Sequence, residues 1–187
     1  TLSLTDEVTI SENAASMGGS QVFLQAGETY KVEELLKGIA IASGNDAVVA
    51  MAEKVSGSVS YFVALMNEKA KSLGLTNTKF LNPHGLDTEG HVTTARDMAI
   101  IARELIKHTS ILKFTSIYED YLKKSDGSSI WLVNTNKLVR FYDGVDGLKT
   151  GFTKNAGYCL TSTAKKNNTR FITVVMGAET SDKRSSD

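Results

Sequence analysis

A lysine, a threonine and a glycine stand in a row at Lys149-Thr150-Gly151, and these residue types suit recognition of a peptide carboxylate. In an extended strand, Lys149 and Gly151 share one side and Thr150 points to the other. Gly151 has no side chain, so another backbone can come close to the strand there. The stretch predicts a cationic strand that pairs main chain to main chain with a peptide ligand. An ordinary strand end with a surface lysine is the alternative.

A second polar stretch, Ser43-Gly44-Asn45, interrupts two apolar stripes of helical spacing. The stripes are Val32, Leu35, Leu36, Ile39 and Ala40 before it, and Val48, Met51, Ala52 and Val55 after it. Gly44 breaks the helical pattern, and Asn45 is predicted to cap the helix that follows. We therefore expect Ser43 and Asn45 at a tight junction between two buried helices. There they either cap helix ends or take part in chemistry.

Two more helices follow in the first half of the chain. One is predicted over about 60–73, and the other begins at Thr94, where Thr94-Ala95-Arg96-Asp97 matches a capping box. The segment between them is irregular and contains His84 and His91. The spacing of these histidines fits no zinc pattern, so structural or hydrogen-bonding roles are favoured and no metal site is predicted.

The pattern changes after residue 115. Short segments at 117–121, 130–133 and 137–140 are typical of strands or ribbon-like loops. Segments 157–165 and 170–177 flank a predicted hairpin turn, and with the Lys149-Thr150-Gly151 segment they predict three adjacent antiparallel strands. The fold class is therefore α/β, of the α+β kind, in one domain over 1–187. Residues 1–115 form a mostly helical lobe, and residues 116–187 a mostly sheet part.

Composition excludes several function classes. With 21 basic and 21 acidic residues the formal net charge is zero, and no basic patch predicts nucleic acid binding. A single cysteine excludes an internal disulfide. No apolar run approaches roughly 18 residues, so no transmembrane helix is predicted. Thr1 does not begin a signal peptide, and we expect both ends to be cut from a longer chain.

Together these motifs carry a resemblance to a known family. Ser43-Gly44-Asn45 followed by Lys149-Thr150-Gly151 is similar to the second and third motifs of the penicillin-recognising serine enzymes. The segments 41–47, 82–87, 94–99 and 146–151 narrow the resemblance to low-molecular-mass penicillin-binding proteins, the serine-type D-alanyl-D-alanine carboxypeptidases. The resemblance runs from about residue 4 to about residue 184. It implies the fold shared by penicillin-binding proteins and β-lactamases, with N- and C-terminal elements missing.

The resemblance implies a reaction and roles for individual residues. Such enzymes remove the terminal D-alanine from peptidoglycan stem peptides through an acyl-enzyme, and β-lactams mimic that D-alanyl-D-alanine end. Ser43 would relay a proton toward the leaving amine, and Asn45 would hydrogen-bond the substrate. Lys149 would supply positive potential and keep nearby amines neutral.

The resemblance also implies residues that bind substrate. Thr150 would bind the terminal carboxylate, and the strand at Gly151 would pair with the substrate backbone. Arg184, which follows the last predicted strand, would help to bind the carboxylate. No cofactor is needed for acyl transfer by serine and lysine.

One feature departs from the family pattern. The nucleophile is expected in an S-x-x-K motif upstream of Ser43, and none is present there. Two later matches begin at Ser110 and Ser162, in the wrong order for the family. We expect the nucleophile before Thr1, which would make these 187 residues inactive by themselves. Loss of flanking elements would expose apolar surface and favour self-association.

Two other function classes share part of this evidence. A β-lactamase has the same motif order but needs a general base for deacylation, and a non-catalytic peptidoglycan- or penicillin-binding module would bind without turnover. A transpeptidase outcome, in which an amine replaces water as the acceptor, also stays open. Because peptidoglycan lies outside the cytoplasmic membrane, the resemblance implies an extracytoplasmic, cell-envelope protein whose parent is exported and membrane-associated.

Overall fold

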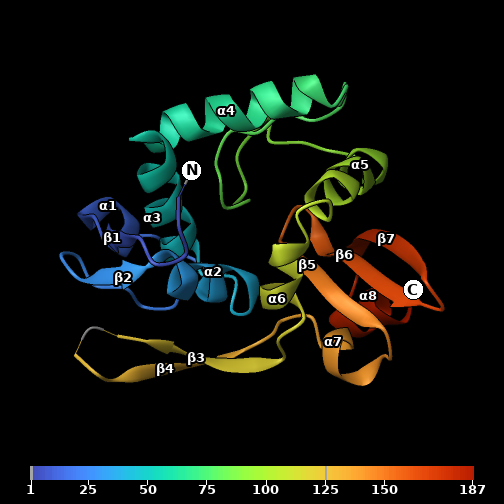
Figure 1. Cartoon of the computed structure of the whole chain (residues 1–187). Coiled ribbons are helices and arrows are strands. Elements are labelled where there is room, and N and C mark those ends of the chain that lie inside the picture. The colour runs from blue at the N-terminus through green and yellow to red at the C-terminus, as the bar shows by residue number, and fades with distance from the viewer. Residues whose placement is uncertain (1, 125) are drawn as a thin grey trace.

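The computed structural model describes residues 2–124 and 126–187, so Thr1 and Ser125 lie outside the described residues. Helices dominate the first part of the chain and strands the second (Figure 1). Figure 1 shows α2 and α3 on one side and the strands β5, β6 and β7 on the other, with α6 between them. Helix α4 lies across the top of the view, and α5 lies next to β6 and β7.

The helical part is built on apolar stripes. A small ribbon of β1 (Glu7–Thr9) and β2 (Thr29–Lys31) precedes it, with the short α1 (Glu12–Ala15) between the two strands. The main helices are α2 (Val32–Ala40), α3 (Asn45–Ser56), α4 (Val59–Ser72) and α5 (Ala95–Leu105). The predicted helices are confirmed. Thr94 accepts a hydrogen bond from the backbone N–H of Asp97 at 3.1 Å, which is one half of the predicted capping box.

The second part begins with a 3₁₀ turn (Thr109–Ile111) and α6 (Leu112–Thr115). Next come the hairpin of β3 (Glu119–Lys123) and β4 (Ser129–Val133), and then α7 (Leu138–Phe141). An antiparallel sheet follows, in the order β5 (Val145–Thr153), β6 (Gly157–Lys166), β7 (Thr169–Ala178), and α8 (Ser181–Ser186) lies after β7. The predicted three-stranded arrangement is confirmed, and Asn167 and Asn168 form the tight turn with φ of 47° and 63°.

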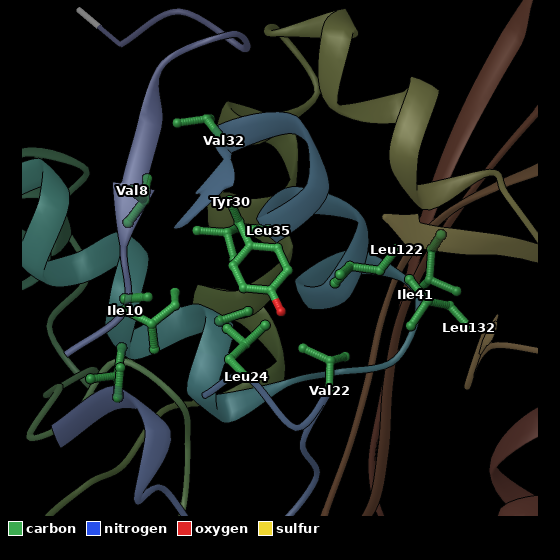
Figure 2. Packing of buried hydrophobic residues seen from close by; sticks show 14 residues of the cluster. Val8, Ile10, Val22, Leu24, Tyr30, Val32, Leu35, Ile41, Leu122 and Leu132 are labelled. Carbon is green, nitrogen blue, oxygen red and sulfur yellow. The ribbon is translucent and has the colours of Figure 1, made fainter. Parts of the chain in front are cut away.

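A continuous apolar core joins the β3–β4 hairpin to the helical part. Leu122 and Leu132 of the hairpin are 0% and 1% exposed, and Figure 2 shows them beside Ile41. The same cluster contains Val8, Ile10, Ala14, Val22, Leu24, Tyr30, Val32, Leu35, Ala47, Val49 and Ala50. Burying each large aliphatic side chain stabilises the fold by about 1.5–3 kcal/mol. Packing of Leu122 and Leu132 therefore fixes the hairpin against α2.

Two sequence-based predictions are corrected by the structure. The sequence predicts a strand or ribbon-like loop at 137–140, but Leu138–Phe141 form a single helical turn. The strand expected at 117–121 is displaced by two residues, to Glu119–Lys123. Short apolar runs do not distinguish a strand from a helical turn, and element boundaries depend on tertiary packing. Among the described residues, no single helix is long and apolar enough to cross a membrane; α3 and α4 meet that criterion only as a pair bent by 82°.

A buried carboxylate fixes the start of α3. Asp46 is 1% exposed, and its oxygens accept hydrogen bonds from the backbone N–H groups of Val22 and Leu24 at 3.1 Å. It also accepts one from the N–H of Ala47 at 2.9 Å. The first turn of a helix favours a negative charge because of the helix dipole. Asp46 therefore ties the loop before β2 to the helix that follows Ser43.

We expect Asp46→Ala to lower the free energy of unfolding by about 3 kcal/mol, because buried N–H groups would lose their acceptor. Urea titration followed by circular dichroism measures this. Asp143→Ala, at an exposed position, is the control. A loss below about 1 kcal/mol for Asp46→Ala would contradict the anchoring role.

Candidate functional site

A cleft of about 780 Å³ lies between the helical part and the sheet. Its walls come from the α2–α3 junction, the loops at 19–20 and 83–86, strands β5 and β6, and α8. The residues that line it are Gly19, Ser20, Ile39, Ser43, Asn45, Val48, Pro83, His84, Gly85, Leu86, Thr135, Lys149, Thr150, Gly151, Phe152, Thr153, Tyr158 and Arg184. All six residues predicted from sequence as site residues are therefore brought to one cleft. Its volume is in the usual range for ligand sites.

The Ser43-Gly44-Asn45 stretch forms the predicted tight junction. Helix α2 ends at Ala40, and the N–H of Gly44 donates back to the carbonyl of Gly38 at 3.0 Å. Ser43 has a φ of 62°, a left-handed backbone conformation that is uncommon for a residue with a side chain. Such strained positions concentrate at functional sites. The junction therefore holds Ser43 at the cleft wall in a conformation that the helices on either side impose.

The predicted capping role of Asn45 is wrong. Asn45 is the first residue of α3, and Gly44 occupies the N-cap position without a side-chain cap. Instead, Nδ2 of Asn45 donates to the carbonyl of Gly18, and its backbone N–H donates to the carbonyl of Ser20, both at 2.8 Å. Asn45 therefore holds the 18–20 loop against the start of α3. The carboxylate of Asp46, the next residue, accepts the hydrogen bond from the N–H of Ala47 in the first turn.

Strand β5 lies at the edge of its sheet. It pairs with β6 on one side, and within residues 2–124 and 126–187 no strand pairs with its other side. The predicted alternation placed Lys149 and Thr150 on opposite faces, yet both line the cleft. Both residues can line the cleft because β5 borders it along the open edge of the sheet, where side chains from either face are accessible. The open edge is where an extended peptide can add as a further strand.

Two cations dominate the electrostatics of the cleft. Lys149 donates from Nζ to the carbonyl of Thr150 at 3.0 Å. Burial, together with the positive charge of Arg184, lowers the pKa of Lys149 to about 8. Arg184 is 7% exposed, and burial also lowers the pKa of its guanidinium. Its Nε is buried and has no hydrogen-bond partner among the described residues.

The position of Arg184 follows from the end of β7. Thr180 caps the short helix α8, its hydroxyl accepting from the N–H of Lys183 at 3.1 Å. This turn directs the next residue, Arg184, back toward β5 and β6, so that it lines the cleft with Lys149. A buried cation without a hydrogen-bond partner at Nε is costly unless an anion pairs with it. The cleft is therefore suited to an anionic group.

Two residues at the cleft were not assigned to it from sequence. His84 was predicted only as a structural residue; its Nδ1 accepts a hydrogen bond from the N–H of Leu86 at 3.3 Å, and it also lines the cleft. Burial, with a smaller effect of His91, lowers the pKa of His84, which favours the neutral imidazole at neutral pH. Thr135 has no role predicted from the sequence. Its hydroxyl lies 2.6 Å from the hydroxyl of Thr150, a contact that no sequence pattern indicates.

The two downstream S-x-x-K matches do not line the cleft. Ser110 and Lys113 are exposed at the 3₁₀ turn and α6. Ser162 is 6% exposed, and its hydroxyl donates to the carbonyl of Gly147 at 2.8 Å, while Lys165 is exposed. Neither serine is paired with its lysine as a nucleophile with its base would be.

Comparisons with known proteins agree on one family. The family profile described as D-alanyl-D-alanine carboxypeptidase matches residues 1–180. The D-alanyl-D-alanine carboxypeptidase DacF of Bacillus subtilis is 61% identical over 183 residues, covering 98% of this chain and 47% of that protein. DacC of Escherichia coli is 42% identical over 186 residues, covering 96% of this chain and 46% of that protein. The chain thus spans about half the length of these relatives.

Solved structures show the same fold. The D-alanyl-D-alanine carboxypeptidase DacD of Francisella tularensis superposes with a TM-score of 0.92 at 34% identity, covering 99% of this chain and 56% of that one. Penicillin-binding protein 5 of Haemophilus influenzae gives a TM-score of 0.89 at 39% identity, covering 98% and 54%. The DD-transpeptidase of Streptomyces K15 gives 0.92 at 30% identity, covering 99% and 76%. The predicted fold is confirmed.

We expect the two motif glycines to differ in what they do for stability. A Cβ at Gly44 would lie 2.8 Å from the Asp46 carboxylate and 3.2 Å from Val22, whereas a Cβ at Gly151 would meet nothing within 4 Å. Gly44→Ala should therefore cost about 1–3 kcal/mol of unfolding free energy through overpacking. Gly151→Ala should change it by less than about 0.5 kcal/mol. Equal losses in urea titrations would refute this difference.

Proposed function

The chain belongs to the D-alanyl-D-alanine carboxypeptidase family, and from this premise we propose that its cleft binds the D-alanyl-D-alanine end of peptidoglycan stem peptides. The reaction we propose for the site is removal of the terminal D-alanine by acyl transfer, with the 187 residues supplying the side of the site that recognises the substrate. β-Lactams, which mimic the same peptide end, are the other proposed ligands.

The charge of the cleft carries the proposal. Lys149 and Arg184 both line it, and none of the described residues that line it is acidic. The guanidinium of Arg184, which lines the cleft, can donate hydrogen bonds to an anion. Charge-assisted hydrogen bonds from arginine to a carboxylate are among the strongest in proteins. A peptide with a free carboxyl terminus supplies such an anion, and the hydroxyl of Thr150, which also lines the cleft, can bind it.

The open edge of β5 supports binding of the peptide backbone. A substrate in extended conformation would pair with β5 beside Gly151, where added side-chain volume would meet open space and not the protein itself. The protein's own packing therefore does not explain this glycine, whereas close approach of a ligand backbone does. We propose that Asn45 hydrogen-bonds the substrate and that Ser43 relays a proton toward the leaving amine. Both residues lie on the wall opposite β5.

The nucleophile is a separate part of the proposal. No S-x-x-K motif precedes Ser43 within the 187 residues, and the downstream matches at Ser110 and Ser162 do not line the cleft. We propose that the described residues bind substrate and hold Lys149 in place but do not supply the attacking serine. Without it, acylation and turnover by this chain should be lost almost completely.

The proposed site also bears on alternatives and location. A β-lactamase would hydrolyse penicillin in steady state, which a spectrophotometric assay separates from slow acylation.

The same substrate class implies action outside the cytoplasmic membrane, in the cell envelope. Self-association of this chain remains a prediction that light scattering can check.

We predict that binding weakens as Lys149 loses its proton. The pKa of about 8 means that the ammonium is present at pH 7 and is lost as the pH rises through that value. Affinity for an N-acetylated peptide ending in D-alanyl-D-alanine should fall by about ten-fold between about pH 6.5 and 9.5, since a charge-assisted hydrogen bond is lost. Calorimetric titration measures it. Lys149→Met should bind weakly at all pH values, without this dependence.

The pH experiment has clear contrary outcomes. An affinity that is constant over the range, or an equal decline in Lys149→Met, would show that another group is responsible.

Gly151→Ala, which should fold normally, is expected to lose about ten-fold or more in affinity for the same peptide, because its methyl group would overlap the ligand backbone. Unchanged affinity in Gly151→Ala would argue against strand pairing at β5.

A labelling experiment tests the source of the nucleophile. A fluorescent penicillin is incubated with this chain and with a version extended upstream by an S-x-x-K segment. Only the extended version should be labelled, since an acyl-enzyme requires the serine. If the 187-residue chain is labelled, peptide mapping identifies the serine. Ser110 or Ser162 would be the nucleophile that we exclude, and Ser43 would mean that its proposed role is wrong.

A further inference from the structure

The segment Asn134-Thr135-Asn136 connects β4 to α7 and presents one exposed residue between two buried ones. Asn134 is 3% exposed and Asn136 is 1% exposed, whereas Thr135 is exposed and lines the cleft. Buried asparagines are costly unless their amide groups are hydrogen-bonded, so their partners show what the segment holds together.

Both asparagines are tied to the backbone around them. Nδ2 of Asn134 donates to the carbonyls of Ile117 at 2.7 Å and Thr115 at 3.3 Å, and its Oδ1 accepts from the N–H of Asn136 at 2.8 Å. Nδ2 of Asn136 donates to the carbonyl of Gly147 in β5 at 3.4 Å. The backbone on both sides of Thr135 is therefore fixed, and one of its anchors is the strand that carries Lys149.

Thr135 itself contacts both walls of the cleft. Its N–H donates to the carbonyl of Ile41, two residues before Ser43, at 3.2 Å. Its hydroxyl lies 2.6 Å from the hydroxyl of Thr150. Because the backbone is fixed by the buried asparagines, this hydroxyl is held against Thr150 and not left to rotate freely in solvent.

The short contact constrains the direction of the hydroxyl protons. Each hydroxyl has one proton to donate, so only one of the two can donate across the pair. If Thr150 donates to Thr135, its proton is not available to a ligand. If Thr135 donates, the proton of Thr150 points elsewhere, and the bond polarises that hydroxyl as a donor. A carboxylate accepts hydrogen bonds only, so it requires the second arrangement, whereas a terminal amide also donates and is compatible with either.

We propose that Thr135 is a positioning residue that orients the hydroxyl of Thr150 toward a ligand carboxylate. It thereby contributes to selectivity for peptides with a free carboxyl terminus over the same peptides with a terminal amide. The inference rests on the proposed function, since it concerns the same cleft, and it adds a residue that acts through Thr150.

The test compares two peptides and four variants. The probes are an N-acetylated peptide ending in D-alanyl-D-alanine with a free carboxylate, and the same peptide with a C-terminal amide. Their affinities for the chain are measured by calorimetric titration. Thr135→Val and Thr135→Ala remove the hydroxyl, Thr135→Ser keeps it, and Thr173→Val is a matched control at an exposed position of β7. Thermal melts confirm that each variant is folded.

The expected result is a change in selectivity. Thr135→Val and Thr135→Ala should bind the carboxylate peptide about three- to ten-fold more weakly, the range for one hydrogen bond, while affinity for the amide stays within about two-fold. Thr135→Ser and Thr173→Val should retain the selectivity of the unmodified chain.

Three outcomes would overturn the inference. Equal losses for both peptides in the hydroxyl-free variants would mean that Thr135 only maintains the cleft. Unchanged affinities would mean that Thr150 needs no partner. If the unmodified chain binds the two peptides equally, the premise of carboxylate recognition fails, and the proposed function fails with this inference. Selective binding by the unmodified chain with no effect of Thr135 would leave the proposed function intact and remove the inference alone.

Discussion

One wall of the cleft depends on the buried carboxylate of Asp46. Among the described residues its partners are backbone N–H groups, from the loop at 22–24 and the start of α3, and no lysine or arginine pairs with it. Because the carboxylate lies against Gly44, the junction there leaves no room for a side chain. Asn45 then points away from the helix end and holds the 18–20 loop. One buried charge therefore sets the shape of a whole wall of the cleft.

The opposite wall is an edge strand, and its position relative to the first wall is set by polar contacts. The apolar core joins the β3–β4 hairpin to α2, and the segment that leaves this hairpin reaches Ile41 on one side and β5 on the other. Side-chain amides are suited to such a link because they donate and accept in fixed directions. The separation of Ser43 and Lys149 across the cleft is thus fixed by backbone carbonyls and asparagines.

The cleft combines positive charge with an absence of acidic lining residues in the part of the chain that the structure describes. Burial lowers the pKa of both Lys149 and Arg184, and the charge of Arg184 lowers that of Lys149 further, so burial of both cations is unfavourable. An anionic ligand reverses this cost, since it supplies the opposite charge in a partly desolvated site. This charge arrangement is the basis of the proposal that the cleft binds a ligand with a free carboxylate.

Local sequence determined much of this protein. The apolar stripes determined α2 to α5, the Asn167-Asn168 turn determined the β6–β7 hairpin, and the two motifs indicated both walls of the cleft. These features depend on residues close together in the chain, where periodicity and turn chemistry act directly. Only the tertiary structure decided that Asn45 binds a loop and not its own helix, that residues 138–141 turn as a helix, and that Thr135 meets Thr150. The contacts of Asn45 and Thr135 join segments that are distant in sequence, and packing selects them from several partners that local patterns leave open. The turn at 138–141 is local, but its short apolar run does not distinguish a strand from a helical turn.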